Sequence, residues 1–226
     1  MRLILVVYKT PDIDWINNSV PLSRKFNDPY YSIDDGVAEA NYVFLQGNNL
    51  PRRFHNGFQI GELGFGTGLN MLVSYHSFKK SGTRGRLRYT SFEKYPLSKD
   101  QIRKALNNFS SLDTEMLLDH WNNETFSINY KNLFLTVIMG DARDTVKNWT
   151  GKADAWFLDG FSPSKNPQLW GRKLLKDLAQ RTKINGSFAT YSAAGHVREN
   201  MANVGFNVQK IKGYGRKRHM SKGTLS

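Results

Sequence analysis

The sequence predicts an α/β fold built on a mostly parallel, Rossmann-like sheet that ends in an antiparallel hairpin. From residue 58 onward, short apolar stretches alternate with helical patterns, which is typical of a parallel sheet covered by helices. A glycine-rich turn, Gly61–Gly68, lies between a predicted strand and a predicted helix. Near the end of the chain, only Gly213-Tyr214-Gly215 separates the last two predicted strands. Because so short a link cannot cross a sheet, these two strands must pair antiparallel.

Alternation of apolar and polar positions sets the expected element boundaries. We predict strands at residues 58–63, 88–93, 133–139, 153–159, 186–192, 205–212 and 217–224. The interval 97–132 is longer than one crossover helix needs, and its pattern predicts two helices, over 101–106 and 114–118. Residues 1–57 fit no βαβ pattern. We therefore expect them to form a small antiparallel or irregular N-terminal extension packed on a core of residues 58–226, in one structural unit.

Composition excludes several classes of chemistry. The 226 residues contain no cysteine, which rules out disulfides, thiolate nucleophiles and cysteine-bound metal centres. The five histidines are scattered without metal-ligand spacing, so we expect no metal. No apolar run approaches the length of a membrane span, so no membrane partner is expected. The opening Leu3–Val7 is too short for a secretory signal and indicates a strand or a chain end, so we expect a cytoplasmic protein.

The charge balance predicts a polyanionic partner. Lysine and arginine number 32 against 19 acidic residues, which gives a net charge of +13. Two stretches are especially basic, residues 79–88 and residues 212–222. A merely soluble basic protein is the alternative, because neither stretch by itself identifies a nucleic acid.

The spacing of glycines in the turn indicates which ligand it binds. A dinucleotide fingerprint needs a third glycine where this chain has Leu69 or Met71, so that pattern fails. What remains is acid-x-Gly-x-Gly-x-Gly, from Glu62 to Gly68, and this resembles S-adenosylmethionine-dependent methyltransferases of class I. The resemblance implies cofactor contacts from Glu62, Gly64, Phe65, Gly66, Thr67 and Gly68. An ordinary tight turn is the alternative.

Acidic residues also follow the next predicted strands. Ligands in open α/β sheets bind outside the carboxyl ends of the strands, so these positions predict a site. Glu93 ends the second strand, where a ribose diol needs acceptors, and Asp159 ends the fourth. Gly140-Asp141-Ala142 follows the third, where Asp141 can accept a hydrogen bond from an adenine amino group. For each acid, a helix N-cap is the alternative role.

Residues 153–170 are the most specific stretch of the chain, and they resemble the methyltransferase half of the bacterial tRNA 5-methylaminomethyl-2-thiouridine biosynthesis (MnmC) family. The resemblance covers nearly all of residues 15–220. It includes the segments Pro21–Asp28, Tyr30–Ser32, Asp35–Glu39, Tyr42–Asn48, Gly61–Asn70, Tyr191–Gly195 and Gly213–Arg218. It implies S-adenosylmethionine as cofactor and N-methylation of 5-aminomethyl-(2-thio)uridine at the tRNA wobble position.

The same resemblance implies roles for individual residues. Asp159 is the candidate catalytic residue, and we expect it to orient the amine and stabilise its charge, because an aspartate of ordinary pKa is a poor base for an amine. Phe161 and Pro163 are expected to form the wall against the uracil. The expected contacts to the anticodon stem-loop are Arg24, Lys25, Arg52, Arg53, Arg216 and Arg218.

Two further expectations concern partners and alternatives. In better-known family members an FAD-dependent oxidase domain follows the methyltransferase part; we expect it to be absent here and a separate oxidase protein to be a partner. The alternatives are a methyltransferase acting on another amine, or a basic RNA-binding module with a vestigial cofactor pocket.

Overall fold

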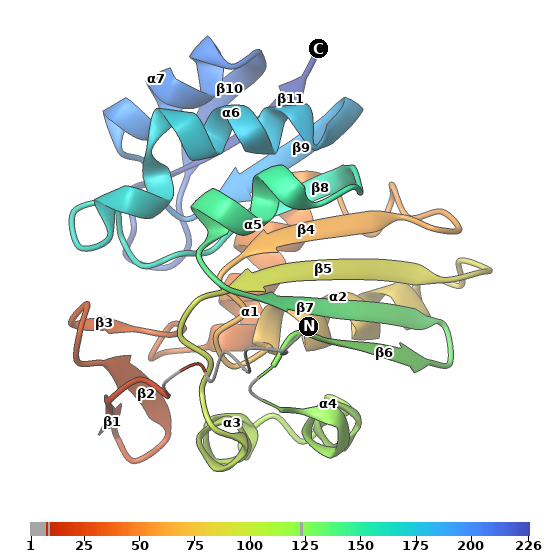
Figure 1. Ribbon diagram of the computed structural model, residues 1–226, viewed down its shortest axis with the longest axis vertical. Helices are drawn as coiled ribbons and strands as arrows, with labels where there is room; N and C mark the ends of the chain where they lie inside the picture. Colours follow the sequence, from red (N-terminus) through yellow and green to blue (C-terminus); the bar gives the residue numbers. More distant parts are fainter. Residues whose placement is uncertain (1–7, 9, 123) are drawn as a thin grey trace, which may run out of the picture.

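The computed structural model describes residues 8, 10–122 and 124–226. In this part of the chain, eight strands form one sheet in the order β10-β11-β9-β8-β4-β5-β7-β6 (Figure 1). The strands are β4 (Gln59–Leu63), β5 (Leu87–Glu93), β6 (Phe126–Tyr130), β7 (Leu133–Met139), β8 (Ala153–Leu158), β9 (Thr182–Thr190), β10 (Phe206–Lys212) and β11 (His219–Leu225).

The directions of the strands confirm the predicted fold class. β4 pairs in parallel with β5 and β8, β5 with β7, and β8 with β9. β11 lies between β9 and β10 and is antiparallel to both, so it forms the predicted hairpin. Two features were not predicted. β6 adds an antiparallel edge strand to β7, and β9 begins at Thr182, with an irregularity in its pairing to β8.

Helices cover both faces of the sheet. On one face, α6 (Arg172–Gln180) packs between α5 (Ala142–Asn148) and α7 (Gly195–Asn203), over an apolar cluster that includes Trp156. On the other face, α2 (Leu69–Lys80) packs on β5 and on the N-terminal helices. The two predicted helices in the interval 97–132 are α3 (Lys99–Leu106) and α4 (Thr114–His120). A short 3-10 helix, η3, covers Pro167–Trp170.

The N-terminal region is part sheet and part helix. The strands β1 (Ile13–Ile16), β2 (Val20–Ser23) and β3 (Asp28–Pro29) form a separate antiparallel sheet. The stretch that follows is helical rather than extended or irregular: α1 (Gly36–Ala40), the π-helix η1 (Asn41–Leu45) and the 3-10 helix η2 (Gln46–Asn48). Burial explains the difference, because Val43, Phe44 and Leu45 all point into the core. The predicted segment 3–7 lies outside the described residues.

The topology brings the predicted site residues to one edge of the sheet. Because β4, β5, β7 and β8 are parallel, the loops after them emerge side by side. The basic stretch 79–88 joins the end of α2 to the start of β5, so it lies at the opposite edge.

Candidate active site

The glycine-rich turn after β4 has a backbone that glycine adopts without strain. The φ angle is +87° at Gly64, +55° at Gly66 and +79° at Gly68, all in the left-handed region. A Cβ on Gly64 would lie 2.7 Å from the backbone oxygen of Asp159, the first residue after β8. The turn therefore packs directly against the end of the neighbouring strand.

Glu93 holds this turn in place from the end of β5. Its Oε2 accepts hydrogen bonds from the backbone N–H groups of Phe65 and Gly66, each at 2.9 Å, and its Oε1 accepts from that of Tyr95 at 2.6 Å. Burial raises the pKa of Glu93, and these N–H donors oppose the rise. Each carboxylate oxygen can accept more than one hydrogen bond. Glu93 can thus shape the turn and still accept from a ligand hydroxyl.

Glu62 lies beneath the turn and is fully buried. It accepts hydrogen bonds from Ser91 Oγ at 2.7 Å and from Asn70 Nδ2 at 3.1 Å. Burial, reinforced by the charge of Asp159, raises the pKa of Glu62 to about 8. Glu62 does not line the cavity that the turn borders, so it supports the site through Asn70.

Asp159 is half-buried at the end of β8 and accepts a 2.6 Å hydrogen bond from Asn70 Nδ2. The Asn70 amide thereby joins the carboxylates of Asp159 and Glu62. Burial is the largest influence on Asp159 and the negative charge of Glu39 is the second; together they raise its pKa to about 7. The pKa of Asp159 therefore lies well above that of an ordinary aspartate.

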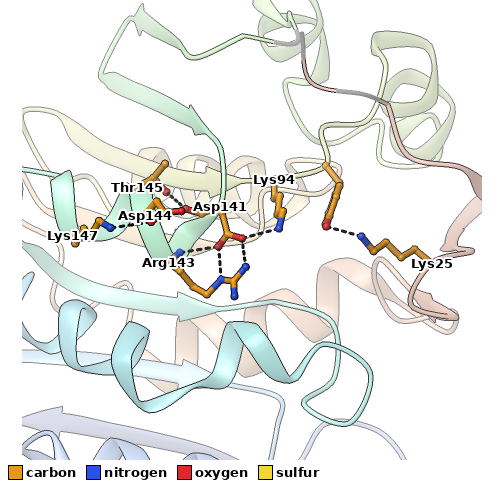
Figure 2. A network of polar contacts seen from close by, with 8 residues as sticks. Lys25, Lys94, Asp141, Arg143, Asp144, Thr145 and Lys147 are labelled. Atoms are coloured by element: carbon orange, nitrogen blue, oxygen red, sulfur yellow. Dashed lines mark hydrogen bonds and ion pairs between the residues drawn. The ribbon is translucent and has the colours of Figure 1, made fainter. Parts of the chain in front are cut away.

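Asp141, by contrast, is a firmly ionised group. It caps α5 by accepting from the backbone N–H of Arg143 at 3.0 Å, which is the alternative role considered for it from the sequence. Its side chain also pairs with the guanidinium of Arg143 at 2.6 Å and with Lys94 Nζ at 2.7 Å (Figure 2). These hydrogen bonds and charges hold the pKa of Asp141 well below its usual range. Its contact with an adenine amino group remains a prediction.

A cavity of about 870 Å³ opens at this edge of the sheet, within the range of small-molecule sites. Its outer wall is aromatic. The Phe161 ring stacks on Phe26 with centroids 4.6 Å apart, and Tyr30 meets it edge-on at 5.2 Å. Because Phe26 and Tyr30 flank β3, the N-terminal region helps to enclose the cavity.

The structure brings many of the predicted site residues to this cavity. Its lining includes Lys25, Gly64, Phe65, Gly66, Thr67, Glu93, Gly140, Asp141, Ala142, Asp159, Phe161 and Arg216. The predicted residues outside the lining are Glu62, Gly68, Pro163, Arg24, Arg52, Arg53 and Arg218.

Arg53 lies away from the cavity, and its contact with the RNA stays a prediction. Its guanidinium donates to the backbone oxygens of Asn48, Asp154 and Asn185 and to Ser187 Oγ, near the starts of β8 and β9. Arg53 therefore ties that edge of the sheet together, away from the cavity.

The other predicted residues outside the lining have varied surroundings. Arg24 is exposed and pairs with Asp14 at 2.6 Å on the small N-terminal sheet. Arg52 is exposed just before β4, at the same edge as Arg53, and Arg218 is exposed beside the hairpin. Pro163 is buried under the loop after β8.

Many residues of the cavity lining were not predicted as site residues, among them Tyr30, Asn70, Tyr191 and Lys217. Asn70 left a usable signal, because it is a polar residue two positions into a helix whose neighbours are apolar. The others come from segments whose position depends on the tertiary fold.

Among the described residues, no group of three or more His, Asp or Glu side chains is arranged to hold a metal ion. In the same part of the chain, every helix is too short or too polar to cross a bilayer.

These features define a nucleotide-type ligand site in a parallel α/β sheet. Gly64 and Gly66 bring bare backbone to the cavity, and the carboxylates of Glu93 and Asp159 suit a ligand with hydroxyl donors and positive charge. S-adenosylmethionine, with a ribose, an amine and a sulfonium, fits this donor set.

Comparison with known proteins also indicates an S-adenosylmethionine site. The sequence model of a family described as S-adenosyl-L-methionine-dependent methyltransferase matches residues 103–226. The tRNA 5-methylaminomethyl-2-thiouridine biosynthesis bifunctional protein MnmC of Leptospira borgpetersenii is 38% identical over 95% of this chain and 35% of its own length. The MnmC protein of Aeromonas hydrophila is 40% identical, over 93% and 35% respectively. The crystal structure of MNMC2 from Aquifex aeolicus matches with a TM-score of 0.79 and 26% identity, covering 96% of this chain and 71% of that one.

The chain therefore belongs to this family of S-adenosylmethionine-dependent methyltransferases. It is similar to the methyltransferase part of MnmC and spans about a third of the length of those curated relatives.

Proposed function

We propose that this chain transfers a methyl group from S-adenosylmethionine to the aminomethyl nitrogen of 5-aminomethyl-(2-thio)uridine at the wobble position of tRNA. The observation that carries the proposal is the placement of Asp159, which faces the same cavity as the glycine turn and the aromatic wall at Phe161. The similarity to MnmC along almost the whole chain supports the choice of substrate.

The acceptor amine must be neutral before it can attack a methyl group. Asp159 is better suited to take its proton than the sequence alone predicted, because its pKa is raised from 3.8 to about 7. This shift brings the pKa of Asp159 closer to that of an amine. It lowers the free-energy cost of moving the proton from the amine to Asp159 by about 4 kcal/mol. We therefore assign Asp159 the role of accepting the proton from the amine. After that proton has passed to solvent, the ionised carboxylate stabilises the cationic product. When bound, S-adenosylmethionine supplies the methyl group on a positively charged sulfonium, and that charge favours the ionised carboxylate.

The mouth of the cavity suits an unstacked base in a charged strand. Lys25 and Arg216 line it, and the rings of Phe161 and Tyr30 offer a stacking surface. A wobble base lies in a loop and is already partly unstacked, so turning it into a pocket costs less than flipping it out of a duplex. The net charge of +13 supports a polyanionic substrate.

We also propose that residues 1–57 and 58–226 act as one structural unit, because Lys25, Tyr30 and Glu39 contribute to the same cavity as the sheet. The separate oxidase partner and the cytoplasmic location remain predictions.

The deciding experiment is methyl transfer to tRNA purified from a strain that lacks the modification, followed by analysis of the wobble nucleoside. We expect the wild-type chain to convert the aminomethyl nucleoside and Asp159→Asn to lose transfer while still binding S-adenosylmethionine by calorimetry. Asp119→Asn, an exposed carboxylate on α4, is the matched control.

Three other results would contradict the proposal. Near-normal turnover by Asp159→Asn would remove this residue from the mechanism. Methylation of small amines but not of tRNA would indicate a different substrate. Binding of tRNA without any binding of S-adenosylmethionine would favour an RNA-binding module with a vestigial pocket.

A further inference from the structure

Glu39 and Lys217 meet across the mouth of the cavity, from opposite ends of the chain. Glu39 belongs to α1, whereas Lys217 lies in the connection between β10 and β11. Glu39 Oε1 accepts from Lys217 Nζ at 2.8 Å, and Glu39 Oε2 accepts from the backbone N–H of Ser32 at 2.9 Å. The Glu39 side chain is 13% exposed and that of Lys217 is 47% exposed. The carboxylate is therefore held firmly, while the ammonium is partly hydrated.

Lys217 also touches the wall of the site. Its Nζ lies 4.3 Å from the centroid of the Tyr191 ring, and the Tyr191 hydroxyl donates to the backbone oxygen of Gly160 at 2.7 Å. Gly160 follows Asp159 directly. Two opposite charges thus line the same cavity as the carboxylate that we assign to the reaction, and neither belongs to the strand-end motif that carries it.

Other charged and titratable groups also act on Asp159 or lie near it. From β3, Asp28 adds negative charge; it accepts from the backbone N–H of Ser162 at 2.9 Å and pairs with Lys165 at 3.1 Å. From the sheet side, Asp159 is faced by buried Glu62 and by two tyrosines, Tyr89 and Tyr191. The pKa values of both tyrosines lie above the ordinary value. Of the charged groups, Glu39 raises the pKa of Asp159 most, and Lys217 lowers it.

The charges of Glu39 and Lys217 matter for the reaction because the acceptor amine must lose a proton. An aminomethyl group arrives mostly as a cation at neutral pH and must lose a proton in this space. A nearby carboxylate favours the protonated site, whereas a nearby ammonium favours the deprotonated one.

We propose that Glu39 and Lys217 are positioning residues of opposite charge. Together they set how tightly a proton is held in the active site, where the acceptor amine meets the Asp159 carboxyl group. Glu39 draws the cationic amine in, and Lys217 promotes loss of its proton. This inference rests on the proposed function, because it assumes a protonated amine as the acceptor.

The test compares Glu39→Gln and Lys217→Gln, each of which removes one charge and nearly keeps the shape. In single-turnover methylation of tRNA, the rate rises with pH as the site loses its proton. We expect Lys217→Gln to move this rise to higher pH and Glu39→Gln to move it to lower pH, each by roughly 0.5 to 1 pH unit. The double variant returns close to the wild-type profile. Lys173→Gln, which removes an exposed charge on α6, leaves the profile in place.

An ion pair that only tied α1 to the hairpin would behave differently. Both single variants would then lower thermal stability alike and leave the pH profile unmoved, or move it in the same direction. Either outcome overturns the inference, because the opposite signs of the two shifts are its content.

A second measurement does not depend on turnover. Carbon-13 NMR titration of the Asp159 carboxyl group should give a higher pKa in Lys217→Gln than in wild type, and a lower one in Glu39→Gln. If wild type fails to methylate tRNA, the proposed function fails, whereas the titration still tests the two charges. If wild type methylates tRNA but the carboxyl pKa is the same in all variants, the inference alone fails.

Discussion

Asp159→Asn should make the protein more stable at alkaline pH while removing its activity. In the folded chain the pKa of Asp159 is about 7, against an ordinary value of 3.8. Between those values the folded state holds a proton that the unfolded chain has lost. The free energy of unfolding therefore falls as pH rises through this window, by up to about 4 kcal/mol for a shift of this size. Asparagine does not titrate, and its carbonyl can still accept from Asn70.

The assay is urea unfolding of wild type and Asp159→Asn at a series of pH values. Below about pH 4 the two proteins should have similar free energies of unfolding, because the protonated carboxyl group and the amide are alike in shape and charge. By about pH 8 the variant should be more stable by about 2 to 4 kcal/mol, the lower figure allowing for partial hydration of the side chain. Asp119→Asn should differ from wild type by no more than about 0.5 kcal/mol throughout. A difference between Asp159→Asn and wild type that did not change with pH would refute the reasoning.

Three further predictions concern the glycine turn, Arg53 and the RNA. Gly64→Ala should lower the free energy of unfolding by about 1 to 3 kcal/mol more than Gly57→Ala, because both have positive φ but only Gly64 faces a backbone oxygen; equal losses in urea unfolding would contradict this. Arg53→Met should cost about 2 to 4 kcal/mol of stability by leaving buried acceptors unpaired, with tRNA affinity unchanged in filter binding; a folded variant with weakened tRNA binding would support its predicted role. Raising salt from about 50 to 200 mM should weaken tRNA affinity by at least roughly tenfold, and a flat response would argue against phosphate contacts.

The parts of the molecule that could be predicted from sequence are those with a local signature. Short apolar strands, the spacing from Glu62 to Gly68 and the acids after successive strands are each set by a few neighbouring residues. Parallel topology then brings the strand ends together, so the expected cavity edge follows without knowledge of distant contacts. The C-terminal hairpin was predictable because the link at Gly213–Gly215 permits one arrangement only.

The parts that were missed depend on burial that the local pattern does not specify. The run Asn41–Leu45 is rich in β-branched and aromatic residues, yet it is helical because three of its side chains pack into the core. The alternating stretch Phe126–Tyr130 is compatible with an edge strand, but only its antiparallel pairing with β7 shows that it forms one. Arg53 carries the same charge as a phosphate contact, and only its four acceptors show that it serves the opposite edge.

The division between local and distant contributions also applies to the chemistry. The motif places a carboxylate at the end of β8, but a carboxylate of ordinary pKa would be a weak base for an amine. Burial raises its pKa most, and the charged groups that adjust it further come from α1, from β3 and from the link before β11, which lie far from it in sequence. Removing their charges should therefore alter the pH at which Asp159 works without moving the glycine turn or the strand ends. A motif of this kind specifies where a reaction can occur, while the segments that close over it set the proton affinity with which it proceeds.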